Sequence, residues 1–321
     1  MIEHPETFEP INLAFNSVFV PNRMSIGVVL PLSSTAAGEQ ADAYPHLERV
    51  QLIEELGFAA LWIRDIPFND PNFGDVGQVY DPFVYLGLLA GATDRIALGT
   101  ASIILPLRHP AHVAKAAASV DQLSGGRLLL GIASGDRPIE YPAMNVDFEG
   151  RGAAFRDSVE YIRATAGNFP TAENAFGTLA GAIDLLPKPA GDRIPMLVTG
   201  GSQQSHEWAA ENGDGWMMYP RGVDYQAMLL NHWRENVANA SLGPKPTMQS
   251  FAIDLLDDDD AEPERIHLGL RTGMGALIET LQAYQGIGIH HVALNLRQNQ
   301  GDLVATLRRL ANELLPVFYG E

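Results

Sequence analysis

The feature that most constrains the fold is an alternation of short apolar runs with helical patterns, repeated eight times between residues 25 and 315. Several of the apolar runs are hydrophobic at consecutive positions, which is typical of strands covered on both faces. Eight parallel strands with intervening helices close most simply as an α/β fold of the (β/α)8 TIM barrel type. The alternative is a doubly wound open sheet, but the chain lacks the glycine fingerprint of dinucleotide-binding sheets. The predicted strands are 25–30, 59–63, 96–105, 127–133, 196–199, 215–218, 248–256 and 291–296.

Two segments fall outside this alternation. A longer insertion separates the fourth predicted strand from the fifth, and it holds a predicted helix over 153–166 and a Pro- and Gly-rich stretch that runs to residue 193. Residues 1–23 form an irregular N-terminal arm with several apolar side chains. The arm packs either on the barrel or on a partner subunit. We therefore divide the chain into this arm and a single barrel domain over residues 24–321.

Charge and composition exclude several classes of function. The chain has 321 residues and a formal net charge of −18, with 21 basic against 39 acidic side chains. Such a field repels phosphodiester backbones and anionic lipid, so we expect no nucleic-acid or membrane partner. Cysteine is absent, which excludes disulfides, thiolate metal ligands and cysteine nucleophiles. The first residues are acidic and resemble no signal peptide, and no apolar run approaches the ~20 residues of a membrane helix, so we expect a cytoplasmic protein.

The segment 199–205 has the composition of a phosphate site. Gly200 and Gly201 follow the strand 196–199 and allow a sharp turn into a helix predicted over 203–212. The first N–H groups of such a helix, with the positive end of the helix dipole behind them, commonly bind a phosphate. Ser202 and Ser205, three residues apart on the predicted first turn, add two hydroxyl donors. The alternative interpretation is a capped helix start with no ligand.

Function in a barrel lies at the C-terminal ends of the strands, so the phosphate site shares one rim with other polar residues. Asp65 ends the second strand, where it acts as a general base, as a ligand anchor, or only as the salt-bridge partner of a nearby arginine. Arg137 follows the fourth strand. It either reaches a phosphate through two N–H groups or pairs with Asp136 or Glu140.

Metal and nucleophilic hydrolysis are poorly supported. The paired histidines are His109 with His112 and His290 with His291. Neighbouring residues of a strand face opposite ways, so His290 and His291 cannot both enter the barrel mouth, and we predict no metal site. The chain also lacks a Gly-X-Ser-X-Gly elbow and a Walker loop, which argues against a serine hydrolase and a nucleotide triphosphatase.

Read together, six segments resemble the bacterial luciferase-like flavin monooxygenases. They are 54–62 (EELGFAALW), 98–110 (LGTASIILPLRHP), 121–127 (DQLSGGR), 131–135 (GIASG), 201–202 (GS) and 207–216 (EWAAENGDGW). The resemblance implies a barrel that binds reduced FMN, or the deazaflavin F420, at its C-terminal mouth. It also implies a phosphate at Gly201 and Ser202 with a hydroxyl from Ser205, a non-prolyl cis peptide at Ala101–Ser102 beneath the ring, and a homodimer. The cofactor contacts predicted in this way are Thr100, Ala101, Ser102, Ala133, Ser134, Arg137, Gly200, Gly201, Ser202 and Ser205.

Two positions depart from the luciferase pattern. The histidine that follows the second strand in luciferases is matched here by Asp65, with Arg64 before it. A carboxylate is normally charged at neutral pH, so chemistry that needs a neutral imidazole is not expected. Ser134 stands where some luciferases use an arginine for the phosphate, and Arg137 is the residue that could compensate. We assign substrate or peroxide contact to Asp65 and Arg64 as candidate catalytic residues.

The sequence therefore predicts a flavin-dependent monooxygenase. FMN reduced by a separate NAD(P)H-dependent reductase would react with O₂ and oxidise a small organic substrate. One alternative is hydride transfer with F420, whose long acidic tail needs basic residues at the mouth. Because basic residues are sparse in this chain, the prediction favours FMN. The other alternative is a flavin-binding protein without catalytic activity, suggested by the missing histidine.

Overall fold

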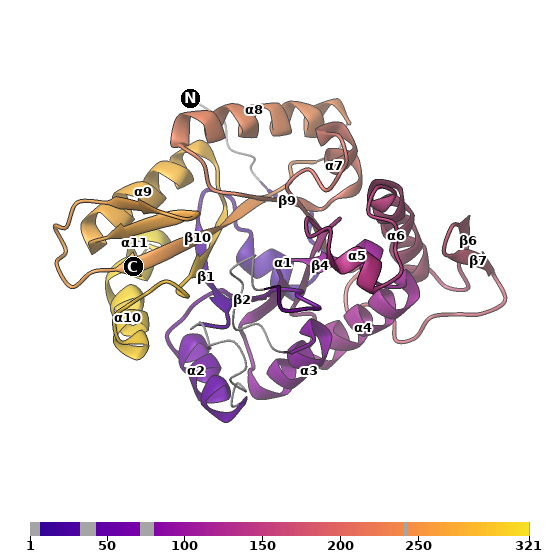
Figure 1. Cartoon of the computed structure of the whole chain (residues 1–321), viewed down its shortest axis with the longest axis horizontal. Coiled ribbons are helices and arrows are strands. Elements are labelled where there is room, and N and C mark those ends of the chain that lie inside the picture. Colours follow the sequence, from indigo (N-terminus) through magenta and orange to yellow (C-terminus); the bar gives the residue numbers. More distant parts are fainter. Residues whose placement is uncertain (1–6, 33–42, 71–79, 241–242, 321) are drawn as a thin grey trace.

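Eight parallel strands close into a barrel in the computed structural model, which describes residues 7–32, 43–70, 80–240 and 243–320 (Figure 1). The order around the barrel begins with β1, β2, β3 and β5, continues with β8, β9 and β10, and ends with β13. β10 pairs with both β9 and β13, which closes the ring and confirms the predicted TIM barrel. The strands are β1 (Ser25–Leu30), β2 (Ala60–Ile63), β3 (Ala97–Thr100), β5 (Leu128–Ala133), β8 (Met196–Thr199), β9 (Gly215–Met218), β10 (Thr247–Leu255) and β13 (His291–Asn295).

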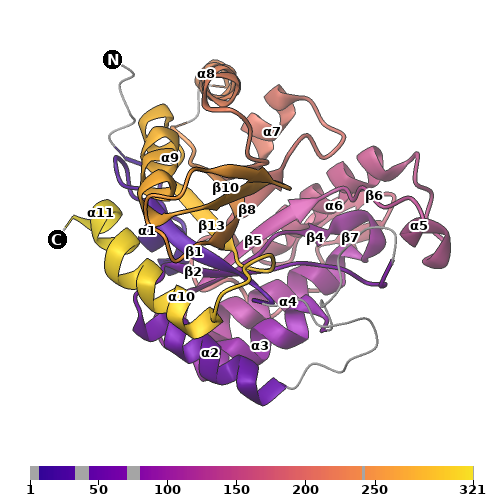
Figure 2. The same cartoon turned by 60° about the vertical axis from the view of Figure 1, so that its left-hand side comes forward.

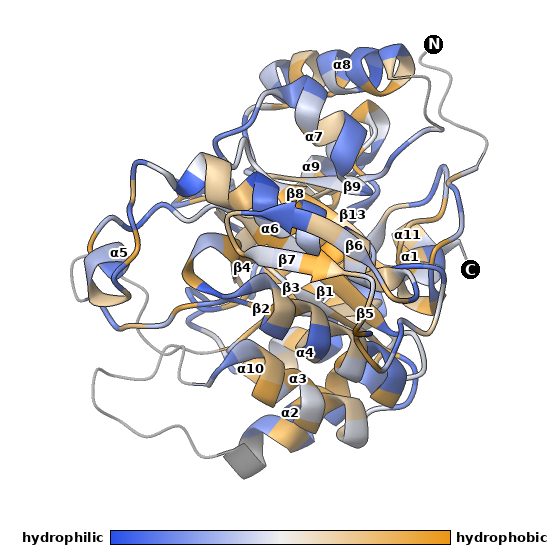
Figure 3. Ribbon diagram, turned by 90° about the vertical axis from the view of Figure 1, so that its right-hand side faces the viewer, coloured by the Kyte–Doolittle hydropathy of each residue, from blue (hydrophilic) through white to orange (hydrophobic). Residues whose placement is uncertain are grey.

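Helices surround the barrel as an outer layer (Figure 2). The outward faces of the strands and the inward faces of the helices form one large apolar core, to which Ile26, Leu61 and Leu98 belong. Figure 3 shows hydrophobic residues gathered on the central strands, while most outer helices carry polar residues as well. The helices are α2 (Ala43–Glu55), α3 (Pro82–Ala92), α4 (Pro110–Leu123), α6 (Arg151–Ala166), α7 (His206–Asn212), α8 (Val223–Asn239), α9 (Met274–Ile287), α10 (Leu303–Arg309), a π-helical turn (Leu310–Leu314) and α11 (Leu315–Tyr319).

The third predicted strand, 96–105, is interrupted. β3 ends at Thr100, the peptide between Ala101 and Ser102 is cis, and β4 (Ile103–Ile104) then resumes pairing with β5 before a 3₁₀ turn (Leu105–Leu107). The continuous strand was therefore a wrong prediction, whereas the cis peptide implied by the resemblance is present. Gly131 on β5 faces this interruption, and a Cβ atom there would lie 2.0 Å from the Thr100 carbonyl oxygen. Only glycine fits so close an approach of two strands.

The insertion lies where it was predicted, between β5 and β8. It contains α5 (Glu140–Ala143), the helix α6 and a hairpin of β6 (Thr171–Asn174) and β7 (Gly177–Ala180). A second pair of strands, β11 (Glu264–Ile266) and β12 (Gly269–Thr272), extends the sheet beside β10. Neither of these hairpins was predicted.

The N-terminal arm is not irregular throughout. Its first six residues lie outside the described part of the chain, but Leu13–Val18 form the helix α1, whose first turn is capped by Asn12. Buried side chains of the arm, such as Phe15 and Phe19, share one cluster with inward-facing barrel residues such as Leu129. The arm therefore packs on its own barrel and closes the N-terminal end, which leaves the opposite end for function.

A hydrogen-bonded chain ties this closed end together. Trp62 donates from Nε1 to Nε2 of His291 over 2.8 Å, and Nδ1 of His291 lies 2.6 Å from Oγ of Ser25. The Ser25 hydroxyl donates in turn to the carbonyl oxygen of Val18 in α1 over 2.7 Å. These roles require a neutral imidazole with its proton on Nδ1. His291 is fully buried, and burial lowers its pKa from 6.5 to about 3.

Candidate active site

The strand ends at the C-terminal mouth of the barrel carry the predicted site residues. After β8, the chain makes the turn 200–205 before α7 begins at His206. Gly200, Ser202 and Gln203 all adopt positive φ angles. The helix predicted from Gln203 therefore starts three residues later, because successive left-handed residues make a turn and not a helix.

Ser202 and Ser205 have different roles in the 200–205 turn. Ser205 is the N-cap of α7, and its Oγ accepts the N–H of Trp208 at 3.2 Å. Ser202 lies before the helix, and its hydroxyl donates to the carbonyl oxygen of Thr199 at 2.7 Å. Placing both serines on the first helical turn was wrong. The capped helix start of the alternative interpretation is present, although a cap does not exclude a ligand.

The backbone of the 200–205 turn offers donors for an anion. Gly200 donates to the Met217 carbonyl and Gln204 to the Gly201 carbonyl, whereas within the described residues the N–H groups of Gly201, Ser202 and Gln203 have no acceptor. Consecutive N–H groups in such a turn form an anion-binding concavity, and the N-terminus of α7 adds its positive end. The turn is well anchored, because Trp216 donates to the carbonyl oxygen of Gly200 at 2.9 Å. The donor set therefore fits a terminal phosphate.

The interrupted third strand lies beside this turn. Ser102 is hydrogen-bonded through its hydroxyl to Oγ1 of Thr199, and both hydroxyls approach the sulfur of Met217, at 3.6 and 3.4 Å. Thr100 is buried and donates to the Gly131 carbonyl at 2.8 Å. Ala101 is partly exposed. The structure thus brings Ala101 and Ser102 together with the 200–205 turn and leaves Thr100 inside the barrel.

The loop after β5 folds over its own strand end. Ala133 is partly exposed and Ser134 is buried, with its carbonyl accepting the hydroxyl of Tyr141. Arg137 is 5% exposed, and its Nη1 lies 3.7 Å from Oε1 of Glu140, which is 1% exposed. Burial lowers the pKa of Arg137 and raises that of Glu140, and the opposite charge of each partner reduces the shift. The alternative of pairing with Glu140 is therefore present in the structure.

Asp65 is held by an arginine that the sequence analysis left without a role. Oδ2 of Asp65 accepts Nε of Arg108 at 3.0 Å and the N–H of Ile104 at 3.1 Å, and Oδ1 accepts Nη2 of Arg108 at 2.8 Å. Arg108 also contacts Asp81, the N-cap of α3, at 2.8 Å. Although burial opposes the charge, these two carboxylates raise the pKa of Arg108. The salt-bridge interpretation of Asp65 is thus what the structure shows, and its catalytic role stays a prediction.

Arg64 lies one residue beyond β2 and is half-buried. Burial lowers its pKa, while Tyr219 and Asp136 act in the opposite direction. Tyr219 follows β9 on the far side of the barrel, so the guanidinium group of Arg64 interacts electrostatically across the mouth. Asp65 and Arg64 are therefore neighbours in sequence with separate surroundings: the carboxylate of Asp65 is bound by Arg108 and Ile104, and the guanidinium group of Arg64 interacts with Tyr219 and Asp136.

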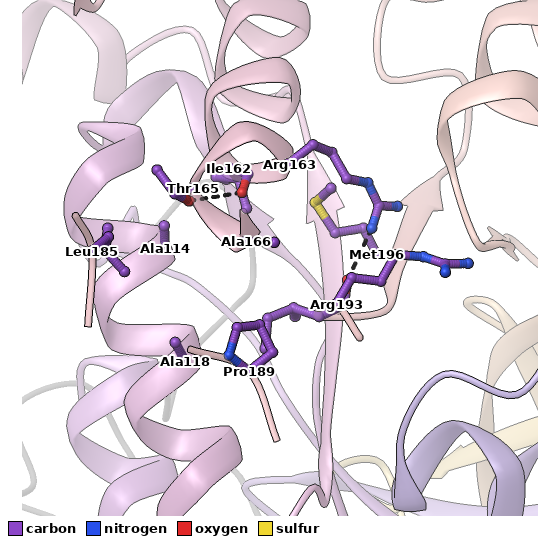
Figure 4. A pocket seen from close by; sticks show the side chains of 11 residues that line it. Ala114, Ala118, Ile162, Arg163, Thr165, Ala166, Leu185, Pro189, Arg193 and Met196 are labelled. Atoms are coloured by element: carbon purple, nitrogen blue, oxygen red, sulfur yellow. Dashed lines mark hydrogen bonds between the residues drawn. The ribbon is translucent and has the colours of Figure 1, made fainter. Parts of the chain in front are cut away.

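Two cavities lie away from the mouth. The smaller, between α4, α6 and the segment before β8, has a volume of about 20 Å³ and is lined by residues such as Ala114 and Ile162 (Figure 4). A space of that size holds about one water molecule. The larger, about 280 Å³, lies beside the N-terminal arm, where Arg163 and Arg193 both pair with Asp214. Neither cavity touches a predicted site residue.

Across residues 7–32, 43–70, 80–240 and 243–320, no group of three or more His, Asp or Glu side chains is placed to hold a metal ion. His291 lies at the closed end of the barrel, and His109 caps α4, where it accepts the N–H of Ala111 at 3.2 Å. Among the same described residues, no helix has the length and hydrophobicity needed to cross a membrane.

Fold and site together define a TIM barrel that carries the glycine-containing turn 200–205 beside a non-prolyl cis peptide at its mouth. The chain belongs to the luciferase-like monooxygenase family, whose model matches residues 24–315. An uncharacterized protein of Mycobacterium tuberculosis is 31% identical over 239 residues, which cover 68% of this chain and 82% of the relative.

Two similar solved structures contain different cofactors. The oxygenating constituent of 3,6-diketocamphane monooxygenase from Pseudomonas putida, a type II Baeyer–Villiger monooxygenase in complex with FMN, has a TM-score of 0.73 and 16% identity, covering 92% of this chain and 98% of that one. An F420-dependent secondary alcohol dehydrogenase in complex with an F420–acetone adduct has a TM-score of 0.75 and 18% identity, covering 92% and 99%. At these identities the likeness shows the shared fold, and the family includes both FMN- and F420-dependent oxidoreductases.

Proposed function

We propose that this protein is an FMN-dependent monooxygenase that oxidises a small organic substrate with O₂. The observation that carries the proposal is the 200–205 turn, whose N–H groups at Gly201, Ser202 and Gln203 point to an anionic ligand at the mouth of a luciferase-like barrel. Reduced FMN, when bound, supplies the electrons that activate O₂. We assign its reduction to a separate NAD(P)H-dependent reductase.

The chain's own residues bind the cofactor, orient it and shield it from water. The 200–205 turn holds the phosphate, with α7 behind it, and the Ala101–Ser102 peptide supports the ring. The loop after β5, fixed by the Tyr141 hydroxyl on the Ser134 carbonyl, covers one side of the mouth and limits the access of water. Asp65 holds Arg108 and the N–H of Ile104, so it keeps the interrupted third strand in place, and Arg64 is the residue that we assign to substrate contact.

F420-dependent hydride transfer is the second candidate. It is favoured by the likeness to the F420-dependent alcohol dehydrogenase and uses the same turn and the same mouth. A flavin-binding protein without turnover is the third candidate. It is suggested by Asp65, which stands at the position of a histidine in luciferases. Turnover distinguishes it: consumption of O₂ and NADH with a supplied reductase, coupled to product formation, rules out storage alone.

We also propose that the protein is a homodimer. α3 has no charged residue in its sequence PFVYLGLLAGA, and its outward face exposes Val84 by 74% and Leu88 by 44%. A helix that is apolar all round is usually buried on more than one side. A second copy of the chain is the partner that we assign to this face.

The cofactor assignment is tested by anaerobic titration with FMN, reduced FMN and F420, followed by fluorescence. Gly201→Asp puts a carboxylate on the turn, and Gly243→Asp puts the same charge on an open, exposed site between α8 and β10, at the other end of the barrel. Because two like charges about 4 Å apart near a protein surface repel by more than ~1 kcal/mol, G201D should weaken flavin binding about tenfold or more, and G243D should not. Equal affinities of the two variants, or no binding to the natural sequence, would refute the proposal. Tighter binding of F420 than of FMN would select the second candidate.

A further inference from the structure

Two arginines stand on the wall of the mouth that faces the 200–205 turn. In the eight-strand ring, β8 is four strands from β1 in either direction, so β1 lies directly opposite the turn. Arg64 follows β2 and Arg297 follows β13, and these are the two strands that flank β1. The rim therefore has one anion-binding turn on one side and two guanidinium groups across from it.

Strand register places the two arginines at the same height. Val28 of β1 pairs with Leu61 on one side and with Leu294 on the other. Arg64 and Arg297 each come three residues after those partners in the sequence. Since neighbouring strands are ~4.8 Å apart, their backbones leave the sheet about 10 Å from each other. Long arginine side chains bridge such a separation when both bind one group between them.

The charges of the mouth arginines act on one another. Burial lowers the pKa of Arg297, and the like charge of Arg64 lowers it further. Arg137, which reaches the mouth from β5, has its pKa lowered by burial and by both Arg64 and Arg297, while Glu140 opposes the shift. Asp136 opposes the shift of Arg64. Arg64, Arg137 and Arg297 thus lie within electrostatic reach of one another in a chain whose net charge is −18.

We propose that Arg64 and Arg297 bind the carboxylate of a small organic acid, and that this acid is the substrate. A guanidinium group has five N–H donors, so each arginine can keep its contacts within the protein and still donate a charge-assisted hydrogen bond to a carboxylate between them. The inference rests on the proposed function, because it takes the 200–205 turn to hold the phosphate of the cofactor. The substrate anion then binds across the mouth, with the reactive part of the cofactor between the two ends.

An acidic cofactor tail has the same chemistry as a substrate carboxylate, so the test separates the two sources. The probe is benzoate, with benzamide as its uncharged match, titrated by calorimetry into the full chain. Three variants are compared: Arg64→Met, Arg297→Met, and Arg308→Met on the exposed surface of α10 as the control. Circular dichroism and the thermal midpoint check that each variant is folded.

The expected result is that the natural sequence binds benzoate in the millimolar range and prefers it to benzamide. R64M and R297M should each weaken benzoate binding about tenfold, which corresponds to 1.4 kcal/mol, and R308M should not. The variant G201D should bind benzoate as the natural sequence does, because the turn is on the other side of the mouth.

Three results would overturn the inference. The first is benzoate affinity that is unchanged in R64M and R297M, and the second is benzoate binding that is lost in G201D instead. The third is F420 affinity that falls in R64M and R297M while benzoate affinity does not, which would assign the two arginines to a cofactor tail. FMN titration of the natural sequence decides the proposed function separately, because it does not depend on benzoate.

Discussion

The buried His291 gives the stability of this barrel a specific dependence on pH. Its imidazole is neutral in the folded state, because it accepts from Trp62 on one nitrogen and lies against Ser25 on the other, and burial lowers its pKa from 6.5 to about 3. In the unfolded chain the same group takes up a proton near pH 6.5. The folded state therefore binds fewer protons between these two values, and its stability falls as the pH falls.

The size of the effect follows from this difference. Above about pH 7 the group is neutral in both states and contributes no pH dependence. Below that, each pH unit removes about 1.4 kcal/mol, so the loss is about 2 kcal/mol at about pH 5 and about 3 kcal/mol at about pH 4. It levels off below the folded-state pKa. For a domain of typical stability, this is a large share of the free energy of unfolding.

The assay is urea unfolding at several pH values, with His291→Gln as the matched variant. Glutamine cannot titrate, and its amide can accept from Trp62 and donate to Ser25, so the variant keeps polar partners for both. The difference in unfolding free energy between the two proteins should change by about 1.4 kcal/mol per pH unit below pH 6.5 and should be constant above it. An NMR titration should show that the ring signals of His291 stay unchanged down to about pH 4.

Parallel stability curves for the natural sequence and H291Q would refute this reasoning. An NMR titration in which His291 titrates near its usual pKa would refute it as well. Either result means that the imidazole becomes charged in the folded protein at little cost in free energy. The remaining acid sensitivity, common to both proteins, then belongs to other groups and cancels in the comparison.

Three further predictions concern packing. Phe15→Ala should lower the unfolding free energy by about 3 to 5 kcal/mol in urea denaturation, because Phe15 is 2% exposed in the closed end of the barrel; Leu13→Ala, 56% exposed on the same helix, should change it little. Gly131→Ala should impair folding, because its Cβ would lie 2.0 Å from the backbone of the third strand, whereas Gly87→Ala has open space and should retain or raise the thermal midpoint. Val84→Glu should shift the mass measured by light scattering from dimer to monomer, and an unchanged mass would exclude α3 as the interface.

The sequence predicted those parts of the fold that depend on regular patterns. The eight strands were found because each is a short apolar run between helical segments, and burial on both faces imposes that pattern. The helix α1 was missed because it has only six residues and is held by contacts with the barrel. The hairpin of β6 and β7 was missed because Thr171–Asn174 alternates exposed and half-buried residues with no apolar face. Short elements of this kind depend on tertiary contacts more than on local preference.

The candidate site likewise has parts that the sequence predicted and parts that it did not. The Gly200–Gly201 turn is a local signal, so its position on the rim was predictable. The start of α7 was not, because Ser202 and Ser205 are both suitable N-caps and the sequence does not choose between them. The pairing of Asp65 with Arg108 joins residues 43 positions apart, and the same carboxylate accepts the N–H of Ile104, which follows the interruption of the third strand, so it depends on tertiary contacts. The opposition of Arg64 and Arg297 to the turn likewise required the ring order.

The closed end of the barrel also sets an order for synthesis. α1 leaves the ribosome before the strands of the barrel, yet the cluster that receives it includes Met248 and Ala293, and Ser25 meets a histidine 266 positions later in the chain. A nascent chain therefore carries Phe15 and Phe19 without all of their final neighbours until β13 has emerged. Docking of α1 is thus a late step of folding, and its apolar side chains stay open to aggregation while the strands are synthesised.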